Sequence, residues 1–136
     1  MKVFVDSNIP MYVAGADHPH RAPSIQFLKN AEADGLELCT STEVLQEILY
    51  RFSGMGRRDV GASLYDLFVA LMPEVFDVTL ADTDLAKTLL LSHEGISARD
   101  AVHAGVMINR DVRVMATFDR GFDDLDGITR LELGHV

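Results

Sequence analysis

Short apolar runs alternate with longer amphipathic stretches along most of the chain. Runs rich in β-branched and other apolar residues predict buried strands, and apolar positions three and four residues apart predict helices. The predicted strands cover residues 2–5, 36–40, 75–79, 112–117 and 128–133. The predicted helices cover residues 7–13, 21–33, 41–53, 59–72, 81–93 and 97–109. This alternation indicates an α/β fold in which helices cover both faces of a central, mostly parallel sheet of four to five strands.

Length and composition fit one ordinary folded domain spanning residues 1–136. Hydrophobic residues make up 48% of the 136 positions, which is typical of a chain with a real core and excludes a disordered one. The apolar stretches are too short to cross a bilayer, and the N-terminus lacks the long apolar region of a secretory signal. Cys39 is the only cysteine, so no intramolecular disulfide can form, and we expect a cytoplasmic protein.

The net charge of -9 is unusual for a protein that binds nucleic acid, because such proteins are mostly basic. A solubilising acidic surface explains most of the acids. Alternatively, some of them converge on a cation, which would reverse the local charge and allow a phosphate to approach. Composition leaves both readings open, so the positions of the acids must decide between them.

Two acids follow predicted strands. Asp6 stands where the first strand ends, and Asp119 stands two residues after the fourth. If both strands are central and parallel, their carboxyl ends bring both carboxylates to the same edge of the sheet, where sites in such folds lie. Each acid also has an ordinary explanation, since Asp6 can cap the next helix and Asp119 can shape a turn before Gly121.

Two further acids lie within predicted helices. Asp100 can close a capping box with Ser97, which is a sufficient structural reason for it. Glu47 lies in the middle of its helix at the border of the apolar stripe, where an acid has a weaker structural reason. Glu43 lies almost opposite that stripe and three residues after Thr40, so we assign Glu43 to a capping box and Glu47 to the site.

Four gathered carboxylates repel one another unless a cation or a proton compensates them. Oxygen ligands without a paired cysteine favour Mg²⁺, with Mn²⁺ as a possible substitute, over zinc. Cys39 has no partner at zinc-site spacing, and His18-Pro19-His20 is interpreted as a loop. His103 could reach the face of Asp100 but is interpreted as a packed helix residue.

Four segments together resemble the motifs of the PIN-domain nucleases. They are Val3-Phe4-Val5-Asp6-Ser7-Asn8, Ser41-Thr42-Glu43-Val44-Leu45-Gln46-Glu47-Ile48-Leu49, Ala98-Arg99-Asp100-Ala101-Val102-His103-Ala104 and Ala116-Thr117-Phe118-Asp119-Arg120-Gly121-Phe122. No single segment is specific, but all four occur in the family's order and with about its spacing. The compact chain is most similar to the VapC toxins of toxin–antitoxin pairs.

The resemblance implies a three-layer α/β/α sandwich and a metal-dependent endoribonuclease that hydrolyses RNA phosphodiester bonds. It places the metal-binding acids at Asp6, Glu47, Asp100 and Asp119, of which Asp6 and Asp100 are the expected direct ligands. It also matches three supporting residues, which are Asn8, Thr117 and, less firmly, Asp123. A protein antitoxin and a homodimer are further expectations from the family.

Other classes remain open at this stage. A stand-alone PIN nuclease would process RNA without an antitoxin, and a non-catalytic binding module would keep the fold with its acids as caps and surface charge. A phosphatase or a FLAP-like DNA nuclease is a third possibility.

The sequence indicates the surfaces that bind substrate or partner less clearly than it indicates the acidic site. Five arginines are candidate RNA contacts, although a solvated loop explains those near residue 54 as well: Arg51, Arg57, Arg58, Arg99 and Arg120. The few aromatic residues predict little recognition of bases by stacking. Leu64, Tyr65 and Phe68 could line an apolar groove for an antitoxin helix, belong to the core or form a dimer surface.

Overall fold

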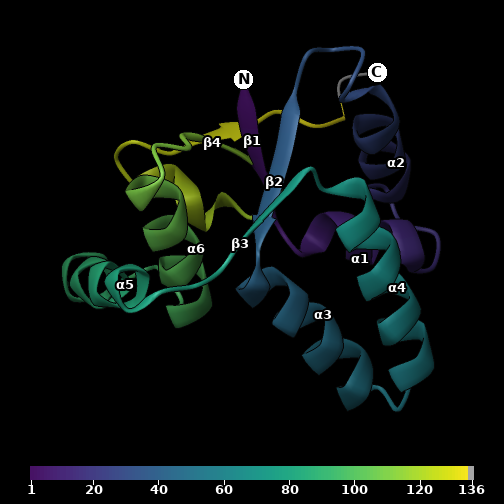
Figure 1. Ribbon diagram of the computed structural model, residues 1–136, viewed down its shortest axis with the longest axis horizontal. Helices are drawn as coiled ribbons and strands as arrows, with labels where there is room; N and C mark the ends of the chain where they lie inside the picture. The colour runs from purple at the N-terminus through teal and green to yellow at the C-terminus, as the bar shows by residue number, and fades with distance from the viewer. Residues whose placement is uncertain (135–136) are drawn as a thin grey trace.

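The computed structural model describes residues 1–134 and places a five-stranded sheet between two layers of helices (Figure 1). The strand order is β3-β2-β1-β4-β5, and every neighbouring pair is parallel. The strands are β1 (Lys2–Val5), β2 (Glu37–Ser41), β3 (Glu74–Phe76), β4 (Val114–Ala116) and β5 (Thr129–Leu131). The helices are α1 (Asn8–Ala14), α2 (Arg21–Asn30), α3 (Thr42–Gly54), α4 (Arg58–Leu71), α5 (Leu80–Ser92), α6 (Ala98–Asn109) and the short 3₁₀ helix η1 (Arg120–Asp124).

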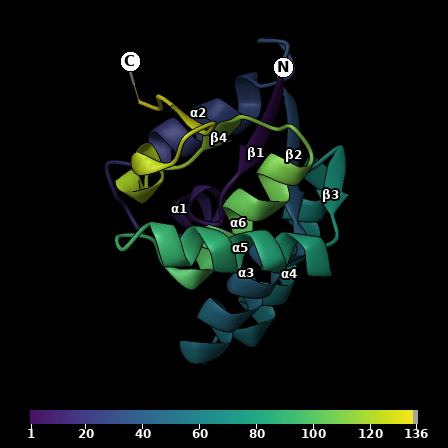
Figure 2. The same cartoon turned by 90° about the vertical axis from the view of Figure 1, so that its left-hand side faces the viewer.

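Helices lie on both sides of the sheet, so the predicted three-layer α/β/α sandwich is confirmed. In Figure 1, α5 and α6 lie on one side of the strands, and α1, α2 and α4 lie on the other. The view in Figure 2 shows α5 crossing in front of the strands. Helix α3 extends past the carboxyl ends of the strands and packs against α4.

The core is centred on β1, whose Val3, Phe4 and Val5 are fully buried. A strand with helices on both faces buries successive side chains on opposite sides, which explains its continuous apolar run. Leu64 and Phe68 of α4 are also buried in this core, and Tyr65 is partly buried against it. Leu64 and Phe68 are therefore core residues and do not line an exposed groove.

Helices α5 and α6 approach each other closely at Gly105. A Cβ atom at this position would lie 2.5 Å from the carbonyl oxygen of Asp82, so only glycine allows this approach. The Asp82 side chain is fully buried and accepts hydrogen bonds from Asn109 (2.8 Å) and Arg110 (2.9 Å). Burial opposes the charged form, but these bonds and those from Thr79 lower the pKa of Asp82 to about 2.

Several predicted boundaries and caps differ from the structure. The third strand ends at Phe76 instead of residue 79, and η1 was not predicted. The Thr40–Glu43 capping box is wrong, because Ser41 is the N-cap of α3 and makes no side-chain cap bond, while Thr40 lies in β2 and its hydroxyl donates to the carbonyl oxygen of Val5. No helix within residues 1–134 is long and apolar enough to span a membrane.

Candidate metal centre

The end of β1 fixes the position of Asp6. Val5 pairs in register with Ala116 of β4, so Asp6 lies level with Thr117 at the carboxyl edge of the sheet. The Thr117 hydroxyl donates to Asp6 Oδ2 at 2.7 Å, and the Ser7 backbone N–H donates to Asp6 Oδ1 at 2.7 Å. Both carboxylate oxygens are therefore held, and the side chain is 6% exposed.

Glu47 reaches the same place from α3. It is buried beside Val44 and Ile48, as expected for a residue at the border of the apolar stripe. Its Oε2 accepts a hydrogen bond from the Ser7 hydroxyl at 2.7 Å, and its Oε1 lies 2.5 Å from Nε2 of His103. The same histidine nitrogen lies 3.7 Å from Asp6 Oδ1, so one buried imidazole faces two carboxylates.

Asp100 and Asp119 complete the group from α6 and from the segment after β4. Ser97 caps α6 by accepting a hydrogen bond from the Asp100 backbone N–H at 3.1 Å. Thr117 Oγ1 accepts from the Asp119 backbone N–H at 3.0 Å, and Asp119 Oδ1 accepts from the Gly121 N–H at 2.8 Å. The Asp119 side chain therefore stabilises a turn and also belongs to the group of four acids.

The four acids line one cavity of about 320 Å³. Its other lining residues are polar or basic, except for one methionine: Ser7, Asn8, Met11, Arg51, Ser97 and Arg99.

The electrostatics show the cost of gathering these acids. Burial, a hydrogen bond with Asp119 and the charges of Asp119 and Asp6 raise the pKa of Asp100 to about 7. Burial also raises the pKa of Asp6, although His103 and Thr117 oppose this rise. A carboxyl with a pKa near neutrality reflects burial first and, for Asp100, like charges that no cation compensates.

Glu47 and His103 form a coupled pair within this cluster. Burial alone would raise the pKa of Glu47 and lower that of His103. The contact between them reverses both effects, so the pKa of Glu47 is lowered and that of His103 is raised. The pair is therefore stabilised as carboxylate and imidazolium.

The donor set fits a hard divalent cation. The cavity is lined by carboxylates, and carboxylate oxygens of Asp6 and Glu47 lie within 4.8 Å of each other and of a ring nitrogen of His103. As an imidazolium, His103 compensates the charge of these acids, and it could bind a cation only after losing its proton. Asn8 contributes a further oxygen: its Nδ2 donates to Thr117 Oγ1 at 3.0 Å, while its buried Oδ1 has no hydrogen-bond partner among the described residues. Carboxylate and amide oxygens are the ligands that Mg²⁺, Mn²⁺ and Ca²⁺ accept.

The remaining candidates fall into two groups. Asn8, Arg51 and Arg99 line the cavity, and Thr117 is bonded to Asp6. Asp123 instead lies on η1, where its two carboxylate oxygens accept hydrogen bonds from Arg130 at 3.1 and 3.2 Å. The lining residues also do not include three of the candidate arginines, namely Arg57, Arg58 and Arg120.

Sequence reasoning gave too little weight to His103 and Glu43. His103 packs against Phe4, as a core residue would, but it also holds Glu47. Its spacing of three residues from Asp100 was the available signal. Burial raises the pKa of the partly buried Glu43, and the charges of His103 and Glu47 also act on it, so this acid borders the cluster.

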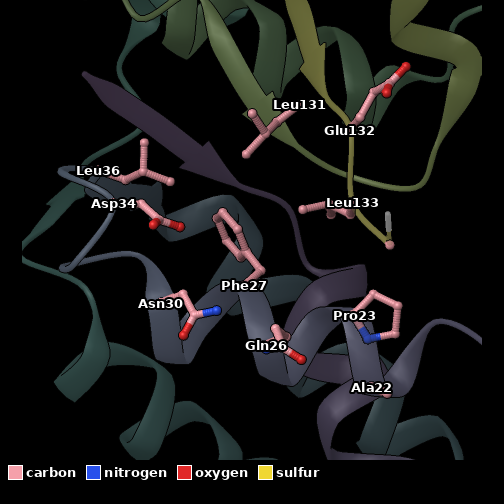
Figure 3. Close-up of a pocket in the computed structure, with 11 residues that line it drawn as sticks. Ala22, Pro23, Gln26, Phe27, Asn30, Asp34, Leu36, Leu131, Glu132 and Leu133 are labelled. Carbon is pink, nitrogen blue, oxygen red and sulfur yellow. The ribbon is translucent and has the colours of Figure 1, made fainter. Parts of the chain in front are cut away.

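A larger cavity of about 570 Å³ lies between α2 and the C-terminal segment (Figure 3). Phe27, Leu131 and Leu133 converge on it, and its lining contains no group of clustered acids or histidines. Of these two cavities, only the smaller one gathers four acids.

Comparison with known proteins is consistent with this arrangement. The PIN domain family model matches residues 3–128. Ribonuclease VapC13 of Mycobacterium tuberculosis is 41% identical over 129 residues, which cover 95% of this chain and 98% of that protein.

Two solved structures share the fold at low sequence identity. VapBC2 from Rickettsia felis, bound to a DNA fragment from its promoter, has a TM-score of 0.78 at 20% identity and covers 98% of this chain and 99% of its own. VapC20 of Mycobacterium tuberculosis, a Sarcin-Ricin loop cleaving toxin, has a TM-score of 0.75 at 19% identity, with coverage of 93% and 96%. From the family match and the 41% identity, this chain belongs to the PIN-domain family and, within it, to the VapC proteins.

Proposed function

We propose that this chain is a Mg²⁺-dependent endoribonuclease and the toxin of a toxin–antitoxin pair. The observation that carries the proposal is the convergence of Asp6, Glu47, Asp100 and Asp119 on one cavity, although they are spread over more than a hundred residues. The ribonuclease name of the relative at 41% identity, matched over nearly its whole length, supports the reaction and the substrate class.

The proposed roles follow from the contacts of each acid. Asp6 and Asp100 would bind the cation directly. Two hydrogen bonds hold the Asp6 carboxylate in place. Burial and neighbouring acids raise the pKa of Asp100 to about 7, so its carboxylate would gain most from a bound cation. Glu47 and Asp119 would bind it directly or through water. When bound, the cation would act as a Lewis acid on the phosphodiester and lower the pKa of water.

The other residues around the cavity orient these acids. Ser7 bridges Asp6 and Glu47, because its N–H bonds the first and its hydroxyl bonds the second. Thr117 donates to Asp6 and accepts from the backbone of Asp119. Such fixed side chains keep the site arranged before substrate arrives, so little reorganisation is needed during the reaction.

RNA must reach this cavity against a net charge of -9. Arg51 and Arg99 line the cavity and are the proposed phosphate contacts, since guanidinium groups bind phosphate oxygens in pairs. The cation would supply the remaining positive charge. Binding should therefore depend strongly on both salt and divalent cations.

The antitoxin is proposed as a partner because solved relatives are VapBC complexes, including one from Salmonella typhimurium bound to DNA. Helices α3 and α4 leave Leu49, Tyr50 and Leu67 exposed, and these side chains offer an apolar surface for a partner helix. A homodimer remains a prediction from the family.

The direct test incubates wild type and Asp100→Asn with total cellular RNA in Mg²⁺ and then in EDTA. We expect discrete cleavage by wild type in Mg²⁺ only, and none by the variant. Equal cleavage by both proteins, or cleavage that persists in EDTA, would contradict the proposed mechanism. Cleavage of DNA in preference to RNA would contradict the substrate class.

A further inference from the structure

Four rings gather on segments that adjoin residues of the acidic cavity, although the sequence predicted little recognition by stacking. They are Tyr12 of α1, His18 and His20 of the connection to α2, and Phe118 after β4, and we call them the aromatic cluster. His20 stacks on Phe118 at 3.9 Å between centroids and 10° between planes. Tyr12 stacks on His18 at 4.6 Å and meets His20 and Phe118 edge-on at 5.1 and 5.4 Å.

The aromatic cluster is continuous with the cavity through the backbone. Phe118 stands between Thr117, which bonds Asp6, and Asp119, which lines the cavity. Tyr12 directly follows Met11, another lining residue. Consecutive Cα atoms lie about 3.8 Å apart, so the backbone of Phe118 and of Tyr12 is within reach of a nucleotide that adjoins a phosphate in the cavity, although the four rings do not themselves line it.

The rings remain accessible despite their mutual contacts. His18 is exposed, and Tyr12, His20 and Phe118 are only partly buried. His18 is the outer ring of the group, since it stacks on Tyr12 and does not contact Phe118 among the ring pairs of the described residues. An exposed ring plane held by packing presents a surface for stacking with little loss of conformational freedom.

A backbone contact fixes the two histidines relative to each other. The His20 backbone N–H donates to His18 Nδ1 at 3.0 Å, so the ring of His18 is held by the chain beside it. Burial and the neighbouring His18 lower the pKa of His20, which favours the neutral form of that ring. Rings held in this way offer flat faces on which a base can stack.

We propose that the aromatic cluster is a stacking subsite for an unpaired nucleobase of RNA adjacent to the scissile phosphate, with His18 as the outer contact. This subsite rests on the proposed ribonuclease function. Stacking of a base on an aromatic side chain requires a single-stranded or looped substrate, because paired bases already stack on each other. The subsite would make the enzyme prefer an unpaired base at one position beside the cut.

The test uses a short labelled single-stranded RNA that spans a site cut by wild type in total RNA. His18→Ala should raise the KM for this RNA about 5- to 150-fold, the range typical for loss of one stacked base, and leave kcat within about twofold. His18→Phe should keep the KM near that of wild type because it retains a ring. His93→Ala, at the end of α5, is the matched control and should change neither constant.

A second RNA, made abasic at each position in turn, separates stacking from folding. At one position the abasic RNA should have a raised KM with wild type, and His18→Ala should add no further increase there. Equal effects of His18→Ala on intact and abasic RNA at every position would overturn the subsite, as they would indicate a packing role. A loss of binding in His18→Phe equal to that in His18→Ala would overturn it as well.

The two proposals can fail separately. If wild type cuts no RNA in Mg²⁺, the proposed function is wrong and the subsite falls with it. If wild type cuts RNA and His18→Ala has the kcat and KM of wild type, only the subsite is wrong.

Discussion

Replacement of Asp100 by asparagine should stabilise the metal-free protein while abolishing its response to metal. In the folded protein the pKa of Asp100 is raised from 3.8 to about 7 by burial and by Asp119 and Asp6. An acid whose folded pKa exceeds its unfolded pKa costs stability as pH rises between those two values. The penalty is therefore absent near pH 4, develops towards pH 7 and is complete above it.

The size of the effect follows from the same numbers. Each pKa unit corresponds to about 1.4 kcal/mol, so a rise from 3.8 to about 7 gives an upper bound of about 4 kcal/mol for the penalty on Asp100. Solvent at the mouth of the cavity screens the charge, and Asp119 shares the interaction, so we expect a gain of ~1–3 kcal/mol in Asp100→Asn at pH 8. For a chain of 136 residues, this corresponds to a rise in Tm of roughly 3–5 °C per kcal/mol.

The assay is thermal unfolding in EDTA at pH 5 and pH 8, followed by circular dichroism. The raised pKa of His103 also makes the folded protein less stable as pH rises. Most of this contribution is common to both proteins, but the charge of Asp100 supplies part of it, so the difference between them reports Asp100 together with its effect on His103. Asp66→Asn, an exposed acid in the middle of α4, is the matched control and should leave the Tm unchanged.

Addition of Mg²⁺ should reverse the ranking. Wild type should gain stability by ligand linkage, and Asp100→Asn should gain little. The reasoning is refuted if Asp100→Asn in EDTA at pH 8 is no more stable than wild type, or if its advantage is as large at pH 5.

Three further changes test how the site and its scaffold are held. Thr117→Val keeps the shape of the side chain but leaves Asp6 Oδ2 and the Asp119 N–H without this hydroxyl partner. Urea unfolding should therefore show a free energy of unfolding lower by ~1–3 kcal/mol. An unchanged urea midpoint would contradict the role of the hydroxyl. Asp82→Ala removes the buried partner of Arg110, and we expect the free energy of unfolding to fall by ~2–3 kcal/mol at pH 7. This loss should shrink as pH falls below 4 towards 2, where the wild-type carboxylate itself protonates. A loss that is independent of pH in this window would contradict the ion pair. Gly105→Ala would place a Cβ atom 2.5 Å from a backbone oxygen, which would force α5 and α6 apart. The free energy of unfolding should fall by at least ~1–3 kcal/mol. A variant with wild-type stability would contradict this close contact.

Local patterns predicted the architecture and, if the first and fourth strands were central and parallel, the meeting of Asp6 with Asp119, which the structure shows. Asp100 was placed in the site by the resemblance to the PIN-domain nucleases, since its own pattern favoured a helix cap. The helical wheel distinguished Glu47 from Glu43, because only a residue at the border of the apolar stripe is drawn into the core.

The contacts that tune the site depend on residues distant in sequence. The bond between His103 and Glu47 joins α6 to α3, and nothing in either segment alone predicts it. The aromatic cluster likewise draws its rings from three segments that lie apart in the sequence. The Thr40–Glu43 box failed because Val5, on the neighbouring strand, takes the Thr40 hydroxyl instead.

Binding of Mn²⁺ by wild type, Asp6→Asn and Asp66→Asn, followed by electron paramagnetic resonance with Mg²⁺ as competitor, tests the metal centre most directly. We expect wild type and Asp66→Asn to bind Mn²⁺ with equal affinity and to release it to Mg²⁺, and Asp6→Asn to lose this binding. Wild-type affinity in Asp6→Asn, or no binding by wild type, would show that these acids do not form a metal site.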